Sequence, residues 1–229
     1  MHAGARVALL QPTAALLRGD AMITTIELGA GARLELVEVA AMVVQSTHGG
    51  PPASLDVTVR LGPNAILEWD AKPLVLCEGC DLRRAISIEL EDGAVVLLRD
   101  TLVFGRAAEQ PGVFITRTDA TYEGIPLHHE ALDTSEIDIF RSEAVLGQSR
   151  VLDTVAIYGA RRQGRDVLQL AGRGSVLMVA AAGTADAHKV VDSTYRSWRV
   201  DPHLAVHDHE FRSPGQEPVC PRLGEHLHR

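Results

Sequence analysis

Lysine is almost absent from this chain. Of its 22 basic residues only Lys72 and Lys189 are lysines, and the others are arginines. Neither lysine stands between a glycine and a serine or threonine, so a phosphate-binding P-loop, which needs a lysine ammonium at that place, is excluded. With 30 acidic residues the formal net charge is −8, which disfavours binding to the phosphate backbone of nucleic acids. The sequence therefore indicates neither a P-loop protein nor a nucleic-acid-binding protein.

Aromatic residues and long apolar runs are also scarce. Aromatics make up 4% of the chain, too few for a platform that stacks bases or sugars. Although 46% of the residues are hydrophobic, no apolar run reaches the ~18 residues that a membrane span needs. The run Val7–Leu10 is too short for the apolar core of a signal peptide, and Gln11-Pro12 interrupts it. We therefore expect a cytoplasmic protein that does not contact the membrane.

No complete catalytic motif is present. The chain lacks the Gly-x-Ser-x-Gly turn that presents a nucleophilic serine. His129-Glu130 begins like a zinc-protease helix, but Asp133 stands where that motif requires its second histidine. We therefore predict that the protein is not an enzyme. A small metallohydrolase that uses His128, His129 and Asp133 remains as a less favoured alternative.

Only three cysteines occur, and two of them stand in Cys77-Glu78-Gly79-Cys80. Such a pair serves as a redox couple or as half of a zinc site. This pair lies between two strand-like segments and not at the start of a helix, and only Cys220 remains to complete a metal site. We interpret Cys77 and Cys80 as turn residues, with a transient metal contact or a redox role as the alternatives.

What the sequence does contain is a repeat. Three times an alternating apolar strand runs into a turn and leaves it as a second apolar run, in Ile23 to Val39, Leu55 to Trp69 and Ile86 to Phe104. The turn residues Ala32, Ala65 and Ala94 recur after 33 and then 29 residues, and Gly124-Ile125 marks a degraded fourth copy. Repeats of this length indicate stacked supersecondary units. We predict a mainly β fold, a stack of β-hairpins or a β-helix.

One helix is predicted near the C-terminus. Thr184 is placed to cap a helix that runs to Trp198. The helical spacing of apolar residues then forms one stripe, made of Ala187, Val190, Val191, Thr194 and Trp198. This helix is expected to pack on the sheet.

The chain changes character after residue 200. Four prolines and half of its ten histidines lie there. We predict one β domain over residues 1–200 and a disordered, His- and Pro-rich tail over residues 201–229. Imidazoles spaced two residues apart suit weak capture of Ni²⁺ or Zn²⁺, and the alternative is a tail whose histidines have no function. The candidate tail ligands are His207, His209, His226 and His228.

Three short segments lie on or just before a repeat. They contain Gly19 and Asp20, then Glu68, Trp69 and Pro73, and then Asp100, Gly105 and Arg106. Together these segments resemble the UreD (UreH) family of urease accessory proteins, and the likeness covers about Leu9 to Trp198. The chain departs from the family pattern at Asp100, where a glutamate is usual, and in its His-rich tail.

The resemblance implies a β-helical stack with two helices and a maturation role without catalysis. Members of that family bind apo-urease and hold UreF, which carries the GTPase UreG, and the assembly inserts nickel into urease. No tightly bound cofactor is implied, and nickel is expected only in transit. Asp20, Glu68 and Asp100 are the candidate acids for nickel passage, because they lie in the family-like segments. The alternative function is a β-solenoid binding module unrelated to urease.

Overall fold

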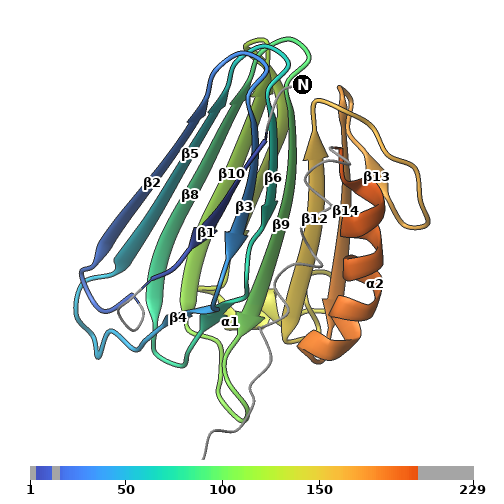
Figure 1. The fold of residues 1–229 in the computed structure, drawn as a ribbon. Coiled ribbons are helices and arrows are strands. Elements are labelled where there is room, and N and C mark those ends of the chain that lie inside the picture. Colours follow the sequence, from blue (N-terminus) through green and yellow to red (C-terminus); the bar gives the residue numbers. More distant parts are fainter. Residues whose placement is uncertain (1–3, 12–15, 201–229) are drawn as a thin grey trace, which may run out of the picture.

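The chain folds into two stacked β-sheets with a helix against one of them (Figure 1). The computed structural model describes residues 4–11 and 16–200. Within these residues, nine strands form a larger sheet in the order β1-β3-β6-β9-β12-β14-β13, in which β7 also pairs with β9 and β4 pairs with β7. Five strands of the same described residues form a smaller sheet, in the order β11-β10-β8-β5-β2. The elements are β1 (Ala5–Leu9), β2 (Ala21–Leu28), β3 (Arg33–Glu38), β4 (Met42–Val44), β5 (Ala53–Leu61), β6 (Ile66–Asp70), β7 (Leu74–Leu76), β8 (Asp81–Leu90), β9 (Val95–Phe104), β10 (Val113–Tyr122), β11 (Ile125–Asp133), α1 (Ile137–Phe140), β12 (Val151–Tyr158), β13 (Leu168–Gln169), β14 (Gly174–Ala181) and α2 (Thr184–Trp198).

Successive segments alternate between the two sheets and so wind into coils. β2, β5 and β8 run parallel in the smaller sheet, and β3, β6 and β9 run parallel in the larger sheet. The pairing register reproduces the sequence repeat, because Arg33 pairs with Ile66 and Ile66 pairs with Val95. The predicted mainly β, β-helical stack is therefore confirmed. The strands around each turn belong to different sheets, so the units are coils of a β-solenoid and not hairpins.

The turns of neighbouring coils also stack. Gly31 N donates to Pro63 O at 2.8 Å, and Asn64 N donates to Asp92 O at 2.9 Å. Gly93 has a φ of +71°, and a Cβ on it would lie 2.3 Å from Oδ1 of Asn64 in the neighbouring turn. Glycine is favoured at this position both by the backbone conformation and by the close contact.

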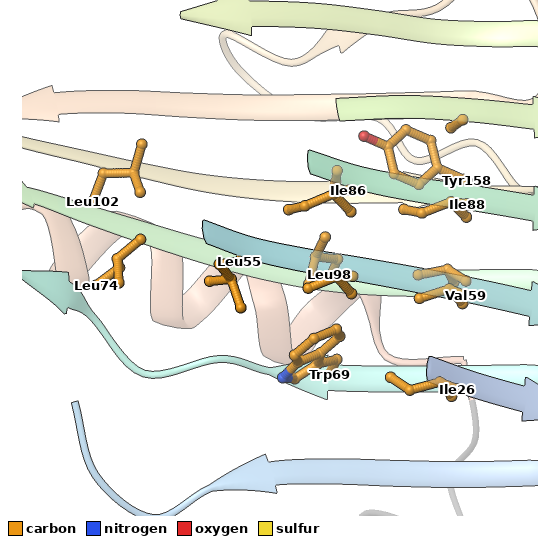
Figure 2. Close-up of a cluster of buried hydrophobic side chains, with 14 of the residues drawn as sticks. Ile26, Leu55, Val59, Trp69, Leu74, Ile86, Ile88, Leu98, Leu102 and Tyr158 are labelled. Atoms are coloured by element: carbon orange, nitrogen blue, oxygen red, sulfur yellow. The ribbon is translucent and has the colours of Figure 1, made fainter. Parts of the chain in front are cut away.

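The core lies between the two sheets. Figure 2 shows inward side chains from both sheets packed together, among them Leu55 and Ile86 of the smaller sheet and Trp69 and Leu98 of the larger sheet. Burial of these side chains stabilises the stack, since a lone coil, with only one strand in the smaller sheet, cannot cover its own apolar side chains from water. Side chains of a strand alternate between its two faces, so the phase of each strand also decides which polar residues point inward.

The fourth predicted copy begins as a coil and ends as a hairpin. β10 runs parallel to β8, but a turn at Glu123 and Gly124, with φ of +49° and +73°, sends the chain back as the antiparallel strand β11. α1, which is the second, short helix that the family resemblance implied, follows β11. β12 then pairs antiparallel with β9, and β14 pairs antiparallel with β12. The parallel stack ends here.

α2 covers the outer face of the larger sheet. It packs on β9, β12 and β14 through the buried residues Ala187, Val191, Tyr195 and Trp198. The apolar run Val95–Leu98 is consequently buried on both faces. Within residues 4–11 and 16–200, no helix has the length and apolar character that a membrane crossing requires.

Two predicted details of α2 are wrong, although its bounds are confirmed. The N-cap is Gly183 and not Thr184, and no side chain bonds to the cap. Val190 is 48% exposed, and Tyr195 is part of the buried stripe instead. The helical repeat of 3.6 residues places positions 187, 191, 195 and 198 on one face, which leaves position 190 outside it.

Candidate functional site

A charged pair lies inside the β-solenoid, between the two sheets. Arg84 of β8 donates from Nη1 and Nη2 to Oδ1 and Oδ2 of Asp100 in β9, at 2.9 and 2.7 Å. Its Nε donates to Oγ1 of Thr116 at 3.0 Å, and the guanidinium carbon lies 5.2 Å from the centre of the Phe114 ring. Both charged side chains point inward because each occupies an inward position in the alternation of its strand.

A small cavity of about 60 Å³ adjoins this pair. Its lining is mostly apolar, and the charged residues that reach it are Arg84, Asp100, Glu38 and Lys72. Glu38 accepts hydrogen bonds from the Lys72 backbone N–H at 2.9 Å and from Nε1 of Trp69 at 3.2 Å. Burial raises the pKa of Glu38, and these two hydrogen bonds oppose the shift. Glu38 thus brings a second carboxylate to the interior.

β11 contributes two further polar side chains, Glu130 and His128. Both line a groove of about 330 Å³ between β11 and β14. Nδ1 of His128 lies 2.8 Å from the Tyr158 hydroxyl, and Nε2 lies 3.7 Å from Oε2 of Glu130. Burial raises the pKa of Glu130, and the negative charge of Asp100 adds to the shift. Burial lowers the pKa of His128, so its ring is neutral near pH 7.

We call Glu38, Asp100, Arg84, Glu130 and His128 the interior polar line. Its carboxylate oxygens and imidazole nitrogens are donors that divalent nickel accepts. Arg84 already neutralises Asp100, however, and no three His, Cys, Asp or Glu side chains of the described residues converge to hold a metal ion. The arrangement suits brief contacts with a passing cation better than a resident metal.

The structure does not bring the three predicted acids together. Asp100 belongs to the interior polar line. Asp20 lies in the exposed turn before β2, where its Oδ2 accepts a hydrogen bond from the Leu17 N–H at 2.8 Å. Glu68 lies on the outer face of the larger sheet, where its Oε2 accepts a hydrogen bond from Nε of Arg199 at 2.8 Å. Of the three, only Asp100 lies between the two sheets, where it lines the small cavity.

The residues at the other family-like positions form turns or pack in the core. Gly19 and Gly105 have φ of +74° and +83°, and their N–H groups donate to Pro51 O and Leu76 O. Trp69 is a core residue, Pro73 O accepts the N–H of Met42, and Arg106 pairs with Glu109. These positions shape the coils, and none of them adds a metal-ligating side chain to the interior polar line.

A second charged cluster, under α2, was missed in the sequence. Arg99 of β9 donates from Nη2 to Oδ2 of Asp153 at 2.8 Å and from Nη1 to Oδ1 of Asp192 at 2.5 Å. Oγ1 of Thr101 donates to the same Asp153, which is 0% exposed. The sequence shows only one acid, Asp153, inside the apolar strand β12, and this pattern alone does not reveal its partners. These contacts fasten α2 to the larger sheet.

Among residues 4–11 and 16–200, the rival metal ligands do not come together. His128 and His129 are neighbours on β11 and point to opposite faces, so His129 pairs with Asp119 on the surface. Cys77 and Cys80 are buried free thiols in the turn between β7 and β8, and burial raises both pKa values, that of Cys80 to about 12. Reactive thiolates need a lowered pKa, so the turn interpretation is favoured. The tail histidines lie outside the described residues.

Comparison with known proteins identifies the family of this chain. The family model of the UreD urease accessory protein matches residues 2–205. The chain belongs to this family. It is 38% identical over 159 residues to urease accessory protein UreD 1 of Streptomyces griseus subsp. griseus, which is 69% of this chain and 62% of the relative. It is 31% identical to UreD 2 of Saccharopolyspora erythraea, over 67% of this chain and 54% of the relative.

The family resemblance drawn from the sequence is thus confirmed. The UreD protein of Frankia casuarinae is 30% identical over 166 residues, which cover 68% of this chain and 52% of that protein. The chain therefore spans between about half and three fifths of the length of these curated relatives.

Proposed function

We propose that this protein is a non-enzymatic maturation factor of urease that acts in the cytoplasm. It binds apo-urease and a UreF-like accessory protein, which brings a UreG-like GTPase, and the assembly inserts nickel into urease in a GTP-dependent step. The proposal is supported by one observation above all, the family match over residues 2–205, which includes every described strand and helix.

The interior polar line supplies a route for nickel as cargo. Asp100 is its central carboxylate, and both of its oxygens are held by Arg84. A nickel ion that reaches Asp100 must displace this guanidinium, because the two cations compete for the same oxygens. Asp20 is proposed as an exposed contact for a partner or an arriving ion. Glu68 acts indirectly, through the position of α2.

The histidine tail is proposed as an auxiliary nickel collector. It contributes when nickel is scarce, because several imidazoles raise the local supply of the ion. The residues concerned are His207, His209, His226 and His228.

Reconstitution tests the proposed function. Apo-urease is incubated with nickel, GTP and the cognate UreF-like and UreG-like proteins, with and without this chain, and urease activity and nickel content are measured. We expect activation only when the chain is present, and no hydrolysis of urea or GTP by the chain alone. Equal activation without the chain, or turnover by the isolated chain, would contradict the proposal.

A further inference from the structure

The β-solenoid ends in an open apolar groove between β11 and β14. The β11 side contributes Leu132, and the larger sheet contributes Leu152 and Met178. At the rim, Leu168 is 61% exposed and Met178 is 37% exposed. Stacked repeats usually cover their last apolar face with a polar capping unit, and an uncovered apolar patch of this kind marks an interaction site.

One carboxylate lies in this groove without a cation of its own. Glu130 accepts no hydrogen bond from any of the described residues. The nearest ionisable side chain in its ion-pair range is that of His128, with Nε2 3.7 Å from Oε2 of Glu130, and this ring is neutral near pH 7. The positive charge of Arg84 acts on Glu130 from a distance, but both terminal nitrogens of Arg84 bind Asp100. A half-buried carboxylate in apolar surroundings is unfavourable until a cation pairs with it.

We propose that the β11–β14 groove is the docking site for an apolar segment of a partner protein that carries one lysine or arginine, whose cation pairs with Glu130. The inference rests on the proposed function, because the partner is taken to be the UreF-like protein or apo-urease. Apolar side chains of the segment cover Leu132, Leu152 and Met178. A volume of about 330 Å³ admits a few side chains and not a folded domain.

Charge complementarity selects this occupant. A wholly apolar segment would bury Glu130 with no partner, and an acidic segment would add a second negative charge beside it. In a segment with one basic residue among apolar ones, the apolar side chains cover the lining of the groove and the cation pairs with Glu130.

Three charge variants test the docking site by measuring affinity for the UreF-like protein and for apo-urease. Met178→Glu puts a charge on the rim, and Glu130→Lys reverses the charge of the groove. Ile23→Glu is the matched control, since Ile23 is 75% exposed on the outer face of β2. We expect the two groove variants to weaken binding of the same partner at least tenfold and the control to change it less than twofold, with melting temperatures showing that all three fold.

A crosslink and a charge swap identify the segment. A photoreactive amino acid in place of Met178 should crosslink to a partner segment that contains a lysine or arginine. Changing that residue to glutamate should restore binding to the Glu130→Lys variant at least fivefold.

The remaining outcomes distinguish a failure of the groove inference from a failure of the proposed function. Wild-type binding by both groove variants, an equal loss with Ile23→Glu, or a crosslink to a second copy of this chain would overturn the groove inference and leave the proposed function standing. Failure of the wild-type chain to bind either partner would overturn the proposed function itself.

Discussion

Arg199, the first residue after α2, donates from Nε to Oε2 of Glu68 at 2.8 Å across 131 positions of sequence. The backbone N–H of Val200 donates to Oε1 of the same carboxylate at 2.6 Å. Glu68 is 0% exposed, so these donors replace the water that its charge would otherwise bind. The end of α2 and the outer face of β6 therefore depend on each other.

Removing the guanidinium should expose this dependence. Arg199→Ala removes a buried counterion of Glu68, and we expect a loss of about 3–5 kcal/mol in the free energy of unfolding, measured with urea. Lys189→Ala is the control on the same helix, since its pair with Asp186 is exposed, and it should cost less than about 0.5 kcal/mol. Equal effects of the two changes would show that the buried pair is not special.

Asp100→Asn should destabilise the protein as well as remove a charge. It leaves Arg84, whose side chain is 6% exposed, without a counterion inside the solenoid, at a cost of about 3 kcal/mol. The double variant Arg84→Gln/Asp100→Asn removes both charges and should recover most of that stability. If Asp100 contacts nickel in transit, the folded double variant still lowers the nickel content of reconstituted urease. Normal nickel loading by the double variant would exclude Asp100 from the route.

Glu130→Gln should stabilise the protein at neutral pH. Burial raises the pKa of Glu130 above its ordinary value of 4.5, so the folded state binds this proton more tightly than the unfolded state, and the ionised side chain costs stability at pH 7. This unfavourable charge vanishes as the pH falls through the raised pKa. The gain in melting temperature should therefore be present at pH 7 and shrink towards zero near pH 4.5. A lower melting temperature of Glu130→Gln than of the wild-type protein at pH 7 would refute the expectation.

Gly93→Ala tests the stacking of the turns. A Cβ at this positive φ would also meet Oδ1 of Asn64, and we expect a loss of about 2 kcal/mol in unfolding free energy. Gly29→Ala is the control, because nothing lies within 4 Å of the Cβ it adds. Its effect should stay within about 1 kcal/mol in either direction. Similar values for both variants would mean that the neighbouring turn adjusts freely.

Truncation after Val200 should leave partner binding and activation at saturating nickel unchanged. The cut keeps the Val200 N–H that donates to Glu68, and it removes only residues 201–229. A deficit is expected at limiting nickel alone, measured as urease activity across a nickel titration. Abolished activation at saturating nickel would place a structural or partner-binding element in the tail.

Most of the fold could be predicted from two patterns in the sequence, the repeat and the alternation of apolar and polar residues within the strands. Leu55, Val57, Val59 and Leu61 alternate with polar residues, and the structure buries all four. The pairing of the strands could not be predicted in the same way. A tight glycine turn between two apolar runs has the same sequence pattern in a hairpin as in a coil whose strands belong to different sheets. Which sheet receives each strand depends on contacts with the next repeat, about 30 residues away.

The site was predictable only in part for a similar reason. Arg84 and Asp100 occupy inward positions of strands β8 and β9, so their phase among apolar neighbours was a signal for a buried pair. The sequence suggests that Asp153 is exposed, because an acid within a strand normally faces water, whereas the structure buries it. Its partner Arg99 lies 54 positions away, and neither residue reveals the contact alone.

The cluster around Glu35 has a consequence for how the molecule unfolds. Glu35 of β3 pairs with Arg6 of β1 at 3.3 Å and with Arg199 after α2 at 3.0 Å. In a simple solenoid each repeat touches only its neighbours, so the ends can fray while the middle stays folded. Here the first strand, the early coils and the last helix share one set of charges. Loss of any one of them disturbs the others, and unfolding should proceed as a single cooperative transition and not coil by coil from an end.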